Sequence, residues 1–165
     1  MIKDRLNVID GAASGVGKSL FDSMKAKGHI KFELFDVNGN LKLVKEIDNT
    51  VSAAGKNMIA EQLLASPAIA KPGWMELGTG TPGATKLGAY ITGSRTAFTS
   101  KTRANNVVTM VTTFAAGKGT GAITEAGVFN TATENAADMI LYTNFGVITK
   151  AATDSLTITW TLTIN

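Results

Sequence analysis

Cysteine is absent from the 165-residue sequence, and histidine occurs once, at position 29. Without cysteine there is no disulfide, thiolate zinc site, iron–sulfur cluster or cysteine nucleophile. A single imidazole also excludes sites that need two histidines, such as the H-E-x-x-H zinc site. No apolar run approaches the roughly 18 residues of a membrane span, and the start lacks the apolar block of a secretory signal. We therefore expect a soluble protein that holds its core without crosslinks, metal or cofactor.

The net charge of +3 comes from the first 31 residues. Six Lys or Arg residues stand there against three Asp residues, and the remaining basic and acidic residues balance. A basic segment on a near-neutral domain either contacts something acidic or is a solvated end. We predict an N-terminal basic arm over residues 1–30, with candidate partner-binding residues Lys3, Arg5, Lys18, Lys25 and Lys27.

Residues 31–165 are predicted to form one domain, because 44% hydrophobic residues and only 3 prolines argue against disorder. The domain opens with two alternating runs, 31–37 and 41–47, separated by Asn38-Gly39. Asn-Gly favours a tight turn with positive φ at both central residues, so the runs should pair as an antiparallel hairpin. A short helix over about residues 50–65 follows, with Asn49 or Thr50 as its cap and Pro67 near its end.

The second half of the chain has the composition of a β protein. Of the 22 threonines, 21 lie after residue 78, and Thr and Val suit a half-buried pleated surface. Candidate strands are 74–77, 90–98, 107–114, 123–129, 139–145 and 155–164. Short strands with turns between them, and no room for crossover helices, predict a mainly β fold. We expect an antiparallel β-sandwich or jelly-roll-like body with one short helix and an N-terminal arm.

Strand 155–164 has the clearest alternation, with an apolar face that includes Trp160 and an opposite face made of threonines. The threonine face is either solvated, which we favour slightly, or lies against another subunit. The glycine-rich stretches 77–83 and 117–121 are read as turns between strands, because their spacing does not fit a dinucleotide fingerprint. Arg95, Lys101 and Arg103 are read as a solvated, salt-bridging loop.

Residues 12–19, Ala-Ala-Ser-Gly-Val-Gly-Lys-Ser, match a loose phosphate-loop pattern. In that reading the backbone amides would cradle phosphates, Lys18 would neutralise them and Ser19 would bind magnesium. A phosphate-loop enzyme needs a parallel sheet of βαβ units, whereas the rest of the chain is predicted to be antiparallel. Nucleotide binding through residues 12–19 is therefore kept only as the weaker alternative.

Catalytic residues are not predicted. His29, next to Gly28, is read as a surface turn residue, and no serine has a placeable histidine partner. The carboxylates Glu125, Glu134, Asp138 and Asp154 lack the spacing of a calcium loop, although two facing carboxylates would suffice for a glycosidase. Trp74, Tyr90 and Trp160 could stack on sugars, but Trp160 lies in the apolar alternation and is predicted to be core.

From about residue 48 to the end, the sequence resembles a group of virion structural proteins of tailed bacteriophages. The matching features occur in order along the chain: Asn49-Thr50-Val51-Ser52-Ala53-Ala54-Gly55, Ile59-Ala60, Leu63-Leu64, Met75-Glu76-Leu77-Gly78-Thr79-Gly80, Arg95, Ile123-Thr124-Glu125-Ala126-Gly127-Val128-Phe129 and the closing strand 156–164. The resemblance implies a virion building block without enzymatic activity, found on heads or on tails.

These observations lead to one expected function with alternatives. We expect a capsid decoration (cement) protein, located in the virion, that binds and stabilises the shell of major capsid protein. The alternative is a tail, collar, baseplate or fibre-attachment component that binds tail or collar proteins. A homo-oligomer is expected, with a trimer compatible with either place. Neither a membrane nor a specific nucleic acid is expected as a partner.

Overall fold

A computed structural model of the protein describes residues 25–165, which form nine strands and one α-helix. The elements are, in order, β1 (Ala26–Phe35), β2 (Leu41–Val51), α1 (Ala53–Glu61), β3 (Trp74–Gly78), β4 (Thr96–Ala97), β5 (Ser100–Ala104), β6 (Val107–Phe114), β7 (Gly121–Phe129), β8 (Met139–Lys150) and β9 (Ser155–Ile164). The described part of the chain is thus mainly antiparallel β with one short helix, which confirms the predicted fold class.

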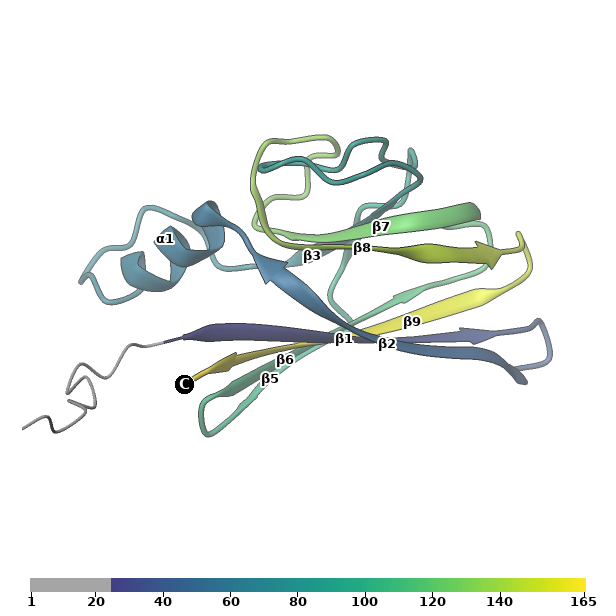
Figure 1. Ribbon diagram of the computed structural model, residues 1–165, viewed down its shortest axis with the longest axis horizontal. Coiled ribbons are helices and arrows are strands. Elements are labelled where there is room, and N and C mark those ends of the chain that lie inside the picture. Colours follow the sequence, from purple (N-terminus) through teal and green to yellow (C-terminus); the bar gives the residue numbers. More distant parts are fainter. Residues whose placement is uncertain (1–24) are drawn as a thin grey trace, which may run out of the picture.

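The strands belong to one curled sheet with the order β4-β3-β7-β8-β2-β1-β9-β6-β5. The sheet folds over into two layers, with β3, β7 and β8 above and β2, β1, β9, β6 and β5 below (Figure 1). The layers are joined by a short pairing in which Thr50 and Val51 of β2 face Tyr142 and Leu141 of β8. Helix α1 lies at one end of the layers (Figure 1).

The core fills the space between the layers. Trp160, Phe32 and Phe114 are fully buried, which confirms that Trp160 is a core residue rather than a sugar platform. Strand β9 is central in its layer, between β1 and β6, so its apolar side chains pack inward against both neighbours. The threonines of β9 lie on the outer face and are half-buried.

The predicted hairpin is present, but its turn differs from the expected one. Strands β1 and β2 pair with Lys31 opposite Glu46. The turn spans residues 36–40, and only Gly39 has positive φ, at +80°. The Asp36 carboxylate accepts hydrogen bonds from the backbone N–H groups of Asn38 and Asn40, so this side chain shapes the longer turn.

The helix is shorter than predicted and begins later. Its N-cap is Ser52, whose Oγ accepts a hydrogen bond of 2.9 Å from the N–H of Gly55. The expected caps, Asn49 and Thr50, continue β2 instead, because pairing with β8 keeps Thr50 and Val51 extended. Helix α1 ends at Glu61 rather than near residue 65.

Two strand predictions need correction. Only residues 96–97 of the predicted strand 90–98 form a strand, while Tyr90 makes one isolated bridge to Gly78. Gly93 turns the chain with φ of +76°, and the Ser94 hydroxyl bonds the backbone of Leu77 in place of a strand partner. The sequence predicts a loop at residues 100–104, but they form β5, which pairs with β6.

The expected boundary between arm and body at residue 30 lies inside β1, which begins at Ala26. Residues 26–30 all pair with β9, and residues 28–30 also pair with β2. Lys25 joins the same layer, since its N–H and C=O both bond the backbone of Asn165. The rest of the predicted arm lies outside the described residues.

Candidate functional site

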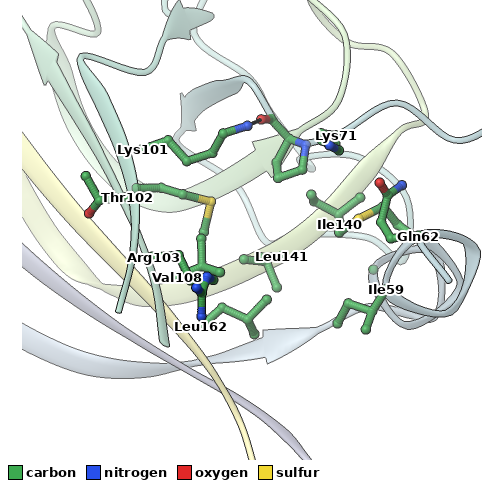
Figure 2. Close-up of a pocket in the computed structure, with 14 residues that line it drawn as sticks. Ile59, Gln62, Lys71, Lys101, Thr102, Arg103, Val108, Ile140, Leu141 and Leu162 are labelled. Carbon is green, nitrogen blue, oxygen red and sulfur yellow. Dashed lines mark hydrogen bonds between the residues drawn. The ribbon is translucent and has the colours of Figure 1, made fainter. Parts of the chain in front are cut away.

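A pocket of about 580 Å³ opens beside α1, where the helix, β8 of the upper layer and strands of the lower layer meet. Its walls are apolar and include Met58 and Ile59 of α1, Ile140 and Leu141 of β8 and Leu162 of β9 (Figure 2). The volume lies within the range of ligand and anchor pockets in proteins, which are mostly apolar with a few convergent polar groups. The pocket is therefore the strongest candidate for a binding site in residues 25–165.

Three cationic side chains, Lys71, Lys101 and Arg103, belong to the pocket lining (Figure 2). The Lys101 ammonium donates a hydrogen bond of 2.8 Å to the carbonyl oxygen of Pro72, and Arg103 donates to the carbonyl oxygen of Asn105. None of the three forms an ion pair with a residue of 25–165, and the lining contains no carboxylate. The pocket thus combines an apolar interior with uncompensated positive charge.

Sequence reasoning missed this site. The sequence predicts a solvated loop at Lys101 and Arg103, yet both lie on β5. Their alternation with Ser100, Thr102 and Ala104 has the period of a strand, and it was the one available signal that the two cations share a face. The other lining residues come from α1, the segment between α1 and β3, β6, β8 and β9, and no local pattern brings these segments together.

The outer face of the lower layer is a second candidate surface. The register sets Thr109 of β6, Thr161 of β9 and His29 of β1 in one row, with Thr102 of β5 and Asp48 of β2 at its ends. No helix or strand among residues 25–165 covers this face (Figure 1). In this row Thr109 and Thr161 are half-buried, whereas Thr102, His29 and Asp48 are exposed, so the face presents threonine hydroxyl and methyl groups beside polar side chains.

Glu125 is fully buried and was read only as one of several scattered carboxylates. Its carboxylate accepts hydrogen bonds from the backbone N–H groups of Gly80, Gly88 and Ala89, at 2.8–2.9 Å. A Cβ on Gly78 would overlap this carboxylate, so the glycine lets the backbone approach it. Glu125 therefore ties the long loop after β3 to β7.

Arg95 is buried as well, which corrects its reading as a solvated loop residue. Its guanidinium lies 3.5 Å from the ring centroid of Phe129 and donates a hydrogen bond of 3.1 Å to Glu76. Burial raises the pKa of the Glu76 carboxyl, while the bond and the positive charge of Arg95 act in the opposite direction. Arg95 also donates to the carbonyl oxygen of Thr131, so it joins β3, β7 and the loop after β7.

Glu134 and Asp138 also contact Arg95, whereas Asp154 has a different partner. Glu134 accepts from the backbone N–H of Arg95, and Asp138 lies 3.7 Å from its guanidinium. Asp154 accepts from Lys42 at 2.7 Å, and this bond lowers the pKa of Asp154. Within residues 25–165, no group of three or more acidic or histidine residues is arranged to hold a metal ion. The same stretch has no helix that is both long and apolar enough to span a membrane.

The predicted partner-binding residues fall into two sets. Lys3, Arg5 and Lys18 lie outside the described residues, as does the phosphate-loop match at 12–19. Lys25 and Lys27 are exposed at the start of β1. His29 is exposed on β1 rather than in a turn, with its Nδ1 3.2 Å from an Asp48 carboxylate oxygen.

Neither a protein-family model, a curated protein nor a solved structure matches this chain.

Proposed function

We propose that this chain is a non-enzymatic structural protein of a tailed-bacteriophage virion, and that it decorates the capsid by binding major capsid protein. The observation that carries the proposal is the uncovered five-stranded face with its rows of threonine. A rigid sheet face of this kind can lie flat on another protein and contribute many small contacts. The sequence resemblance to virion proteins supports the same assignment.

The residues that carry the resemblance are bonded to one another in the fold. The Gly78-Thr79-Gly80 segment meets Glu125 of the second motif, and Arg95 joins Glu76 to Phe129. These contacts hold the upper layer and its long loop in one arrangement. Such internal support suits a part that must keep its shape on a particle.

Copy number tests the assignment most directly. Quantitative mass spectrometry of purified particles, with the major capsid protein as internal standard, should give about one copy per capsid subunit or per few subunits. Six or twelve copies per particle would favour the alternative, a tail, collar, baseplate or fibre-attachment component. Absence from particles would overturn both and would favour the nucleotide-binding alternative, which equilibrium dialysis with ATP and magnesium then tests.

The contribution of the sheet face can be separated from that of the basic arm. Thr159→Arg on the outer face should abolish binding to capsids that lack the protein, whereas Val147→Arg, at an exposed position of β8, should leave binding intact. Removal of residues 1–24 leaves β1 whole, since β1 begins at Ala26, and tests the proposed contacts of Lys3, Arg5 and Lys18. Unchanged binding after this deletion would remove the arm from the proposal.

A further inference from the structure

The pocket beside α1 requires an occupant with two properties. Its apolar walls call for an apolar side chain, because water in such a pocket gains few hydrogen bonds. Its cations, Lys71, Lys101 and Arg103, have no carboxylate partner among residues 25–165, so the occupant should bring negative charge. An apolar group beside a carboxylate satisfies both requirements.

The turn between β1 and β2 presents this combination. Val37 is 71% exposed and Leu41 is 54% exposed, which are high values for aliphatic side chains. Asp36 directly precedes Val37, and its carboxylate accepts three hydrogen bonds, from the N–H groups of Asn38 and Asn40 and from the Asn40 side chain. Bonds from Asn40 lower the pKa of Asp36 and keep it ionised.

The turn is also preformed. A backbone hydrogen bond of 2.9 Å joins the N–H of Asp36 to the carbonyl of Asn40, and another joins Gly39 to Asp36. Groups that are already held in one conformation lose little entropy when they dock. Val37 and Leu41 are thus presented to solvent on a turn, the β1–β2 tip, whose backbone is held by hydrogen bonds.

The tip and the pocket lie at opposite ends of the body. The β1–β2 turn is at the end of the lower layer far from α1, whereas the pocket is beside α1 (Figure 1). The tip of one molecule is therefore placed to meet the pocket of another. Every copy of the chain carries one tip and one pocket.

We propose that the β1–β2 tip of one copy docks in the pocket of a second copy. Val37 and Leu41 occupy the apolar interior, and the Asp36 carboxylate faces the lysines of the rim. A contact between two different surfaces of identical chains is head-to-tail, and it gives either a closed ring or an open row of molecules. This inference stands apart from the virion proposal, because it concerns the purified chain alone.

The test uses the full chain and two variants that each disable one surface. Val37→Lys places a cation against the basic rim, and the double variant Lys101→Glu/Arg103→Glu repels Asp36. All three positions are exposed, so circular dichroism should show both variants folded. Val147→Lys, an exposed apolar position of β8 outside the pocket lining, is the matched control.

Sedimentation velocity measures the outcome. The wild type and the control should associate with rising concentration, and each disabling variant should associate at least about tenfold more weakly. An equimolar mixture of the two variants should form dimers and nothing larger, because it contains one intact tip and one intact pocket. A wild type that stays monomeric up to about 0.5 mM would overturn the proposal, as would a mixture that associates no better than its components.

Discussion

Replacing Glu125 should destabilise the protein strongly, although the residue does not line the pocket. Glu125→Ala removes the acceptor of three backbone N–H groups, those of Gly80, Gly88 and Ala89. A hydrogen bond to a charged group is worth about 1.5–3 kcal/mol, and the donors would be left in a largely buried site. Because the three bonds share one carboxylate and are not additive, we expect a loss of about 3–5 kcal/mol.

Glu125→Gln refines the expectation. The amide keeps one oxygen, which can still accept from Gly80 and Ala89, but its nitrogen then faces the N–H of Gly88. Two donors in contact cannot bond, so we expect a smaller loss of about 1–3 kcal/mol. Glu46→Gln, at an exposed carboxylate of β2, is the control and should change stability by less than about 0.5 kcal/mol.

Urea unfolding, followed by the fluorescence of buried Trp160, measures these differences. With a slope of about 2 kcal/mol per molar urea, a loss of 4 kcal/mol lowers the midpoint by about 2 M. Hydrogen exchange gives a local signature, since the amides of Gly80, Gly88 and Ala89 should lose protection first. A loss of less than about 1 kcal/mol for Glu125→Ala, or amides that stay protected, would show that these bonds do not hold the loop.

Arg95, Asp154 and Gly55 are also buried, and changes at each should have measurable effects. Arg95→Met should cost about 3–5 kcal/mol in urea unfolding, because it leaves the Glu76 carboxylate buried without its partner, and adding Glu76→Gln should recover part of the loss. The lowered pKa of Asp154 contributes stability that is present above the unfolded pKa and disappears as the pH falls through the folded one. The free energy of unfolding of the wild type should therefore fall more steeply below about pH 4 than that of Asp154→Asn, and equal slopes would contradict this. Gly55→Ala should lower the melting temperature, although alanine favours helices, because its Cβ would overlap the Ile140 carbonyl; Gly73→Ala, where nothing lies within 4 Å, should not.

Elements with a strong local pattern were predictable. Strands 107–114 and 155–164 have the predicted bounds, since alternation of apolar and polar residues defines both faces of a strand. The predictions that were wrong concern residues whose local structure depends on a partner distant in sequence. Residues 49–51 stay extended because β8 pairs with them, and Ser94 ends the strand predicted over 90–98 through its bonds to Leu77.

The candidate site could be predicted only in fragments. Alternation along 100–104 indicates that Lys101 and Arg103 share a face. No pattern in the nearby sequence predicts that Met58 or Leu162 lines the same pocket. The pocket lining comes from segments more than 100 residues apart, and their contact depends on the order of strands in the sheet. Strand order is a property of long-range pairing, which single-sequence patterns do not contain.

The sequence by itself determined the β character of the protein, the position of its hairpin and the burial of Trp160, because each follows from the spacing of neighbouring residues. The tertiary structure alone decided which charges are buried and which surfaces are left uncovered. Glu125 and Arg95 carry the same side chains as solvated residues, and only the folded chain supplies the backbone donors and the aromatic face that hold them inside. The burial of a charged side chain and the identity of its hydrogen-bond partners depend on how the layers pack together. The pocket and the threonine face depend on the same packing.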